Sequence, residues 1–535
     1  MGVTLKFSMF WLVRLFLLWG ATMSSAAMDD FQQQILKECK FTRYPTLCVQ
    51  TLMKFESTGH NNKHVHIMSA LINMTISETK LPTSYFAKFT SQFLDLQESQ
   101  RVRDVTDYCE ELMSMSRKRL EKSLLALKES PKKNKHDIQT WLSAALTFQQ
   151  TCKDSVEGLK LSGELNEKIS QKMEYLSQLG SNPLALINRI TSNSREKNND
   201  RLLNEEQFFP DWVSAKDRKL LQVPTIKANA VVAKDGTGNY KTVSEAINAA
   251  SGNRFVIYVK AGVYKEKIRT NKDGITLIGD GKYSTIITGS SSAAGGSSMP
   301  GSATFTITGD GFIARDIGFQ NTAGPHGEQA LALNVGSDHS VFFRCSIVGY
   351  QDTLYALALR QFYRDTDIYG TVDFIFGNAA AVFQNCYIVL RRPTGEYNVI
   401  LAQGRTDPGQ NTGFSLQNCK ITVGSDFSPV KHNYNSYLGR PWKQYSRSVV
   451  MQSTLDEAIS SGGWIEWPGE GGYGKTLYFA EFSNVGPGAS TSKRVNWPGF
   501  HVIGADEAVK FTVGKFIAGS TWLPSTGVTF ISGLG

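Results

Sequence analysis

Beyond its N-terminal segment the sequence has no apolar run long enough to cross a bilayer, so no later membrane span is expected. It contains no G-x-S-x-G, the nucleophile turn of α/β-type serine hydrolases, and this argues against that class of enzyme. It has no aromatic–basic RNA motif, basic recognition helix or zinc-finger spacing, so nucleic acid is not an expected partner. Its seven cysteines form no C-x-x-C pair, and neither a metal site nor a cofactor is predicted.

Length and charge set broad limits on the protein. A chain of 535 residues exceeds a usual single domain, so two or more domains are expected. Its hydrophobic content of 41% is ordinary for globular proteins and is enough for a sizeable core. The formal net charge of +9 suggests an acidic partner or surface, and an acidic polysaccharide fits better than nucleic acid.

The N-terminus predicts a secretory signal over residues 1–27. Lys6 precedes an apolar run, and Ser25 and Ala27 are small residues that suit cleavage before Met28. Arg14 interrupts the apolar run, so an uncleaved membrane anchor is the alternative. In an exported chain, the sequon at Asn73 is a predicted glycosylation site.

The cysteines fall into two groups. An even set in the first third of an exported chain predicts two disulfides. The remaining three lie within a repeat and are expected to be inward-facing core residues. The first group is Cys39, Cys48, Cys109 and Cys152; the second is Cys345, Cys386 and Cys419.

Composition changes twice along the chain. Residues 28–190 have apolar side chains at three- and four-residue spacing, which predicts an up-down helical bundle. Residues 191–222 are polar and poorly periodic, as in a linker, and the basic sequence Arg218-Lys219-Leu220-Leu221 is either a protease site or a solvated charge cluster. Residues 223–535 are predicted to be mostly β, with a short amphipathic helix near residue 245 that caps an open end of the fold and an irregular segment from about residue 475.

A faint repeat organises the β region as far as about Val423. Each unit has an apolar run, a polar residue, a small residue and then a β-branched or aromatic one. The units are centred on Ile317, Cys345, Thr366, Cys386 and Cys419, and the intervals between these centres lie in the range typical of solenoid repeats. Such units are too short for a helical pair and are rich in strand-forming residues, so stacked coils of a parallel β-helix are predicted.

Three polar residues would form a ladder on neighbouring coils. Asp352 and Asp373 are separated by one such interval, and Gln329 precedes Asp352 by a similar one. Neighbouring strands lie about 4.8 Å apart, so one of two such carboxyl groups is expected to keep its proton near neutral pH. A carboxylate beside a carboxylic acid is a nucleophile or base beside an acid. Two turn aspartates that happen to fall one coil apart would show the same spacing.

A second group of residues suggests a carbohydrate site. Arg440 could hold one carboxylate ionised, and Trp442 could stack on a sugar ring. The alternative is that Arg440 forms a structural ion pair and Trp442 is a packing residue. His326 lies in a Gly/Pro turn and is expected to be a surface residue rather than a general base. Further aromatic residues that could add stacking surface, or else belong to the core, are Tyr355, Phe376 and Trp464.

Five motifs in one order resemble those of plant pectin methylesterases. They are G-x-Y-x-E at residues 262–266, Q-A-x-A-L at 329–333, GYQDTL at 349–354, DFIFG at 373–377 and LGRPW at 438–442. The helical part resembles a pectin methylesterase inhibitor domain acting as a pro-region. The resemblance covers nearly the whole chain and implies a four-helix bundle followed by a right-handed parallel β-helix.

The resemblance also implies residue roles. Asp373 would attack the methyl ester carbonyl of a galacturonate residue of pectin (homogalacturonan), and Asp352 would be the acid and then the base. Gln351 would stabilise the oxyanion, Gln329 would help to bind the substrate, and Arg440 would orient Asp373. The implied disulfides are Cys39–Cys48 and Cys109–Cys152. A subtilisin-like protease would cut near Gln222, and a proteinaceous inhibitor is a further expected partner of a monomeric, secreted cell-wall enzyme.

The chain departs from the family pattern at a few positions. Thr366 replaces a cysteine that the family pairs with the one at Cys386, so Cys386 is expected to be a free core thiol. Leu357 and Ala358 replace a His-Ser pair and would remove polar groups near the groove. Met299, with the proline after it, stands where the family tends to have threonines, so a substrate contact there is in doubt.

Two other functions compete with ester hydrolysis. A β-helix polysaccharide hydrolase or lyase would also carry a carboxylate cluster. A pectin-binding or inhibitory wall protein would need no turnover at all. Methanol release separates both from an esterase.

Overall fold

The computed structural model describes residues 31–54, 63–80, 96–159, 164–190, 227–469 and 472–535. Two compact units make up the chain. The predicted signal at 1–27 and the predicted linker and protease site at 191–222 lie outside the described residues. None of the described helices is long and apolar enough to span a membrane.

The N-terminal part is helical, as its apolar spacing predicts. Residues 31–39 are helical, and the helices that follow are α2 (Pro45–Leu52), α3 (Lys63–Glu78), α5 (Leu96–Glu129), α6 (Lys135–Glu157) and α7 (Glu164–Asn188). Their apolar faces form one core, in which Leu71, Leu120 and Leu142 are almost completely buried. Asn73 is exposed on α3.

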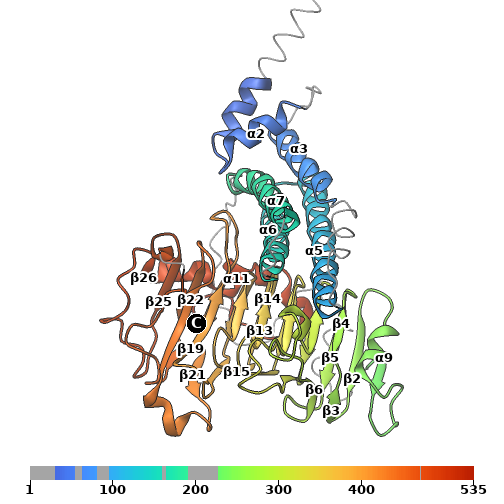
Figure 1. Cartoon of the computed structure of the whole chain (residues 1–535), viewed down its shortest axis with the longest axis vertical. Helices are drawn as coiled ribbons and strands as arrows, with labels where there is room; N and C mark the ends of the chain where they lie inside the picture. Colours follow the sequence, from blue (N-terminus) through green and yellow to red (C-terminus); the bar gives the residue numbers. More distant parts are fainter. Residues whose placement is uncertain (1–30, 55–62, 81–95, 160–163, 191–226, 470–471) are drawn as a thin grey trace, which may run out of the picture. The chain divides into compact units, whose positions relative to one another are not determined.

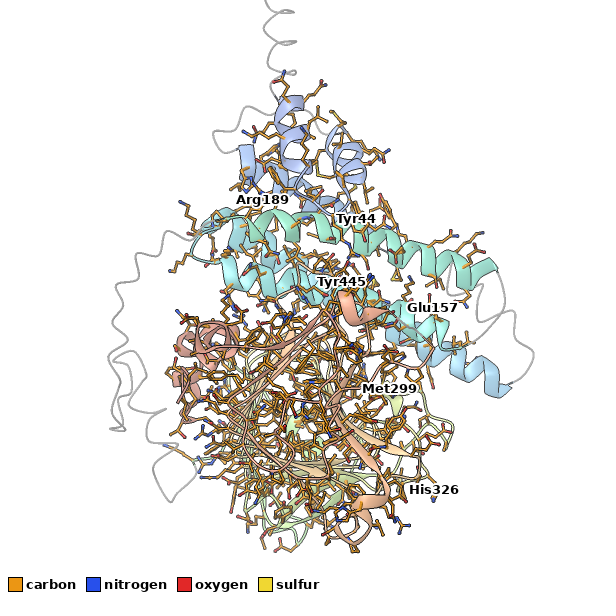
Figure 2. All side chains as sticks on the ribbon, turned by 90° about the vertical axis from the view of Figure 1, so that its left-hand side faces the viewer. Tyr44, Glu157, Arg189, Met299, His326 and Tyr445 are labelled. Atoms are coloured by element: carbon orange, nitrogen blue, oxygen red, sulfur yellow. A yellow bond between two sulfur atoms is a disulfide. The ribbon has the colours of Figure 1, made fainter. Side chains whose placement is uncertain are left out.

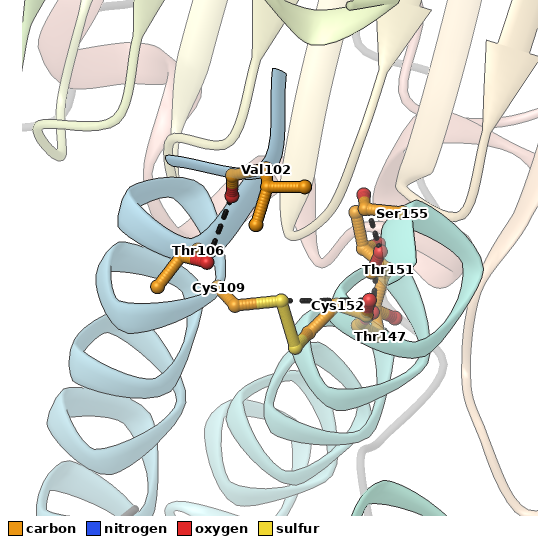
Figure 3. Close-up of a disulfide and its surroundings, with 7 residues drawn as sticks. All are labelled: Val102, Thr106, Cys109, Thr147, Thr151, Cys152 and Ser155. Carbon is orange, nitrogen blue, oxygen red and sulfur yellow. Dashed lines mark hydrogen bonds between the residues drawn. A yellow bond between two sulfur atoms is a disulfide. The ribbon is translucent and has the colours of Figure 1, made fainter. Parts of the chain in front are cut away.

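Two disulfides hold the helices together. One joins Cys39 to Cys48. The other joins Cys109 on α5 to Cys152 on α6, where the Sγ atom of Cys109 also lies 3.5 Å from the carbonyl oxygen of Cys152 (Figure 3). Both predicted pairings are confirmed.

The strands that follow the helical part form a parallel β-helix (Figure 1). Seven successive coils, from β2–β3–β4 to β20–β21–β22, each contribute one strand to each of three sheets, and the paired strands run parallel. The eleven-stranded sheet A contains β1 (Ala230–Val232), β2 (Phe255–Val259), β5 (Ile275–Gly279), β8 (Ile313–Arg315), β11 (Ser340–Phe343), β14 (Arg360–Arg364), β17 (Ala380–Gln384), β20 (Gly413–Gln417), β23 (Arg447–Met451), β25 (Tyr478–Phe482) and β26 (Phe500–Val502).

Two smaller sheets complete the coils. The eight-stranded sheet B contains β3 (Gly262–Lys265), β6 (Thr285–Gly289), β9 (Gly318–Asn321), β12 (Ser346–Val348), β15 (Asp367–Gly370), β18 (Tyr387–Leu390), β21 (Lys420–Val423) and β24 (Thr454–Leu455). The seven-stranded sheet C contains β4 (Ile268–Thr270), β7 (Phe305–Ile307), β10 (Leu333–Val335), β13 (Leu354–Ala356), β16 (Ile375–Gly377), β19 (Tyr397–Gln403) and β22 (Asn435–Pro441).

Each unit of the repeat predicted from the sequence corresponds to one coil of the β-helix. Gly318, Ser346, Asp367, Tyr387 and Lys420 are partners along sheet B, and each directly follows the centre of one predicted unit. The polar residue of each unit turns the corner from sheet A to sheet B in a left-handed conformation, with φ of 50° at Arg344, 51° at Asp365 and 56° at Asn385. The residue that follows is buried, as at Ile317 and Thr366, and the three thiols predicted for the core are free and buried.

The two ends of the β-helix are closed differently. At the first end, α9 (Val243–Asn248) is the predicted cap, and the Glu266 carboxylate accepts from the amide N–H groups of Val243 and Ser244 at its start. At the other end the prediction was wrong in two respects. The coils continue beyond Val423 to β26, and the C-terminal segment is not merely irregular. Its short helices α10 (Ala505–Ala508) and α11 (Val513–Phe516) belong to an apolar cluster with the outer face of sheet A.

Candidate active site

Asp352 and Asp373 stand at the same place on successive coils. They precede β13 and β16 by the same distance along the chain, since the paired residues of these strands are Leu354 and Ile375. The amide N–H of Asp352 donates to the carbonyl of Val372. Both aspartates adopt left-handed backbone conformations, with φ of 59° and 52°. Asp tolerates this conformation better than most residues, so each carboxyl group sits at a sharp turn between sheets B and C.

Arg440 reaches Asp373 from two strands away on sheet C. Its Nε donates to Asp373 Oδ1 at 2.8 Å and its Nη2 to Oδ2 at 2.5 Å, which is the paired geometry that a guanidinium makes with a carboxylate. Its Nη1 donates to the Tyr397 hydroxyl at 3.2 Å. Arg440 therefore pairs with only one carboxyl group of the two, and the environments of Asp352 and Asp373 are unequal.

Because their environments differ, Asp352 and Asp373 lose their protons at different pH values. Burial and the neighbouring Asp373 charge both raise the pKa of Asp352 well above its usual range. Burial also raises the pKa of Asp373, but the hydrogen bonds and charge of Arg440 oppose that shift. Asp352 therefore keeps its proton to a higher pH than Asp373, which leaves an acid beside a carboxylate.

The predicted ladder is wrong about the position of Gln329. The amide N–H of Ala330 donates to the carbonyl of Gln351, which places the loop carrying Gln329 beside Gln351 rather than directly beside Asp352. Gln329 and Gln351 are both half-buried. Two side-chain amides thus lie at the same corner of the coils as the two carboxyl groups.

A layered aromatic cluster lies next to the carboxyl pair. The rings of Tyr355 and Phe376 stack with their centroids 4.3 Å apart and are almost completely buried. Trp442 packs edge-on against both rings and stays half-buried. Of these three residues, Trp442 has the largest exposed surface, while Tyr355 and Phe376 support it.

Trp464 was predicted to add stacking surface, and the structure contradicts this. Its side chain is only 2% exposed, its ring stacks on Phe479, and its indole N–H donates to Glu481. The tryptophan of this loop that reaches the site is Trp467, whose ring centroid is 4.3 Å from the Arg440 Cζ atom. Trp467 and the Tyr397 partner of Arg440 were both missed, although Trp467 stands in the same GGWIEW sequence.

The predicted departures and the turn histidine lie in different surroundings. His326 is exposed, as expected (Figure 2). Leu357 and Ala358 are 2% and 0% exposed, so they do not form the exposed wall of a groove, and apolar side chains suit that interior position. Met299 is half-buried at the start of a short helical turn that its carbonyl caps by accepting from Ser302. Within the described ranges, no group of three or more His, Cys, Asp or Glu side chains could hold a metal ion.

Comparisons with known proteins agree with this geometry. The model of the family described as Pectinesterase matches residues 229–520, and that of plant invertase/pectin methylesterase inhibitor matches residues 33–186. The "Probable pectinesterase/pectinesterase inhibitor 54" of Arabidopsis thaliana is 49% identical over 96% of both chains. "Pectinesterase 2" of Citrus sinensis is 49% identical over 82% of this chain and 83% of its own.

A solved structure resembles the β-helix. A pectin methylesterase from carrot superposes with a TM-score of 0.57 and 52% sequence identity, covering 58% of this chain and all of its own. The matched regions correspond to the helical and the β part of the fold described above. This chain therefore belongs to the pectinesterase family and carries an N-terminal region of the plant invertase/pectin methylesterase inhibitor family.

Proposed function

We propose that this pectinesterase hydrolyses galacturonate methyl esters of pectin with Asp373 as nucleophile and Asp352 as acid and base. The observation that carries the proposal is the pairing of Arg440 with Asp373 alone, beside a second buried carboxyl group on the adjacent coil. An ionised nucleophile and a protonated acid side by side are what acyl transfer to a carboxylate requires.

In the first half of the reaction, an Asp373 oxygen attacks the ester carbonyl carbon. The resulting oxyanion would accept a hydrogen bond from the Gln351 side-chain amide, with Gln329 holding the substrate; one such donor typically contributes about 100- to 1,000-fold in rate. The C–O bond to the methoxy group then breaks as the Asp352 proton moves to the leaving oxygen. Methanol departs and an anhydride joins Asp373 to the galacturonate.

In the second half, Asp352 is a carboxylate and takes a proton from water. The hydroxide oxygen attacks the galacturonate carbonyl carbon, and the bond to Asp373 breaks. Asp373 is released as a carboxylate and Asp352 is again protonated. The products are one galacturonate carboxyl group and one methanol per water consumed. Trp442 would stack on a sugar ring beside the ester.

We further propose that the chain is exported to the cell wall as a monomeric precursor. The predicted signal, the Asn73 sequon and the two disulfides suit an oxidising compartment. The boundaries that follow from this are a signal at 1–27, an inhibitor-like region at 28–190, a linker at 191–222 cut by a subtilisin-like protease, and a catalytic region from 223. The inhibitor-like region, or a separate protein of that type, would bind the catalytic region.

Methanol release from methyl-esterified pectin tests the mechanism. Asp373→Asn is expected to lower the rate by about a thousandfold or more, as loss of a nucleophile usually does. Asp365→Asn, which changes an aspartate at the corner between sheets A and B, is the matched control and should keep its activity. Normal methanol release by Asp373→Asn would refute the assignment, and new reducing ends or unsaturated products would favour a hydrolase or lyase. The relatives give no support to a binding protein without turnover.

A further inference from the structure

The outer face of sheet B carries a group of exposed tyrosine and lysine residues that the reaction does not use. Along its strands the inward residues, such as Phe319, Ile347 and Ile368, belong to the core. The outward residues at one level are Gly318, Ser346, Asp367, Tyr387 and Lys420, which are partners on successive strands. Their character changes along the sheet from small to aromatic and then to basic.

A loop before β6 crosses the small end of this row. The carbonyl of Lys282 accepts a hydrogen bond of 2.7 Å from the Ser346 hydroxyl, and a Cβ atom on Gly318 would lie 2.6 Å from the same oxygen. Glycine and serine at these two positions therefore allow the loop to lie flat on the sheet. The side chain that follows, Tyr283, reaches strand β15.

Tyr283 is held firmly at its hydroxyl group while its ring stays open to solvent. The hydroxyl donates to Asp367 Oδ2 at 2.5 Å and lies 2.9 Å from the Tyr369 hydroxyl. Lys282 Nζ lies 2.7 Å from the same Asp367 oxygen. Nevertheless Tyr283 is 55% exposed. An exposed ring with an anchored hydroxyl is a rigid flat surface, which loses little entropy when it binds a ligand.

The next strand repeats the combination of a ring and a cation. Tyr387, the partner of Asp367 on β18, is 48% exposed, and the Lys420 ammonium lies 5.8 Å from its ring centroid. The Lys282 ammonium is similarly 5.7 Å from the centroid of Tyr283. Among the described residues, Lys420 makes no ion pair, whereas the charge of Lys282 is balanced by Asp367. The face thus offers two rings and one uncompensated positive charge.

We propose that this face, defined by Lys282, Tyr283, Tyr387 and Lys420, binds a de-esterified stretch of galacturonan outside the active site. Each residue of such a chain presents an apolar ring face and a carboxylate. Those two features match an exposed tyrosine ring and a lysine ammonium. Methylation removes the carboxylate charge, so the face distinguishes the polymer that the enzyme makes from the polymer that it consumes. The choice of occupant rests on the proposed function.

The position of the face makes it compatible with catalysis. Asp352 and Asp373 lie at the corner that leads into sheet C, whereas Tyr283 in the loop before β6 and Tyr387 on β18 lie over the outer face of sheet B. One enzyme could hold a demethylated segment on sheet B while its active site works on another segment. Retention on its own product keeps the enzyme beside the region that it has already demethylated.

The test is co-sedimentation of the purified protein with polygalacturonate, comparing the chain with Tyr387→Ala/Lys420→Gln. For the binding measurement the unchanged chain, the sheet B variant and the control variant also carry Trp442→Ala, which weakens binding in the active site; turnover is measured with Trp442 in place. We expect the dissociation constant for polygalacturonate to rise about tenfold in the sheet B variant, and the turnover of short methyl-esterified oligomers to stay unchanged. Val485→Ala/Lys475→Gln, which changes one exposed apolar and one basic residue elsewhere on the β-helix, is the matched control.

Two results would overturn the proposal. One is equal binding by the sheet B variant and the control variant, with both showing the thermal unfolding temperature of the unchanged chain. The other is equal binding of polygalacturonate and fully methylated pectin, because a site that ignores the carboxylate does not recognise the product. Binding to polygalacturonate is measured without turnover. A negative binding result would therefore not contradict the proposed esterase mechanism, and a wrong assignment of the catalytic residues would not change how the binding result is interpreted.

Discussion

Trp467 lies over the guanidinium group of Arg440, with 4.3 Å between its ring centroid and the Arg440 Cζ atom. Arg440 makes two hydrogen bonds to Asp373 and one to the Tyr397 hydroxyl, so the aromatic ring completes its surroundings. A guanidinium stacks favourably on such a ring and is shielded by it from water. The loop that carries Trp467 therefore influences how firmly Arg440 holds Asp373.

Replacing each tryptophan of this loop by alanine in turn should separate an effect on activity from an effect on stability. Trp467→Ala is expected to lower kcat/KM about tenfold and to change the unfolding temperature little, because its side chain is half-buried. Trp464→Ala removes a buried ring and its bond to Glu481, and it should cost about 3–5 kcal/mol of stability. Steady-state kinetics and thermal unfolding of the two variants check this. Equal effects of both changes on both quantities would contradict the assignment of Trp467.

Arg440→Lys should shift the pH dependence of the reaction. Lysine keeps the positive charge but cannot make the paired hydrogen bonds to Asp373. One lost hydrogen bond to a charged group is worth about 1.5–3 kcal/mol, so kcat/KM should fall by roughly 10- to 100-fold. Arg440 opposes the rise that burial causes in the Asp373 pKa, so its replacement should raise that pKa. Activity that needs ionised Asp373 should then begin at a higher pH, and an unchanged acidic limb of the kcat/KM profile would argue against this role.

Asp352→Asn should make the enzyme inactive but more stable at neutral pH. The folded-state pKa of Asp352 is raised above its unfolded value of about 3.9, so its favourable contribution is complete below that value. The contribution is lost as the pH rises through the folded-state pKa, where a buried group must ionise. The uncharged Asn avoids that loss. The unfolding temperature of the variant relative to the unchanged chain should therefore increase between pH 4 and pH 7, and a difference that stays constant with pH would contradict the shift.

The coil repeat was accessible from the sequence because it depends on local chemistry. A left-handed residue followed by an inward residue recurs at successive turns from sheet A to sheet B, as at Asp365 with Thr366 and Asn385 with Cys386. The same intervals set the strand register, so the separation of Asp352 and Asp373 predicted their alignment.

The features that were missed depend on irregular segments. The interval from Gln329 to Asp352 is slightly longer than the step from β10 to β13, and the hydrogen bond from Ala330 to Gln351 shows where the extra length is taken up. Trp464 pairs with Gly439 of β22 and faces the core, but nothing in its sequence separates it from Trp467 in the same loop. The four-residue helices of the C-terminal segment are too short to show a helical period.

Gly404 leaves room for Trp442 and offers a test of the aromatic wall. A Cβ atom at residue 404 would lie 2.7 Å from Trp442 Cε3, closer than carbon atoms can approach, so Gly404→Ala must displace the indole ring. We expect KM for pectin to rise several-fold and the unfolding temperature to change by no more than a few degrees, since the ring is half-buried and can move outward. The matched control is Gly395→Ala, where a Cβ atom would meet nothing within 4 Å. If both variants bind pectin like the unchanged chain, Trp442 does not form the sugar-binding surface, because a ring moved from its seat on Tyr355 and Phe376 could not present the same face to the substrate.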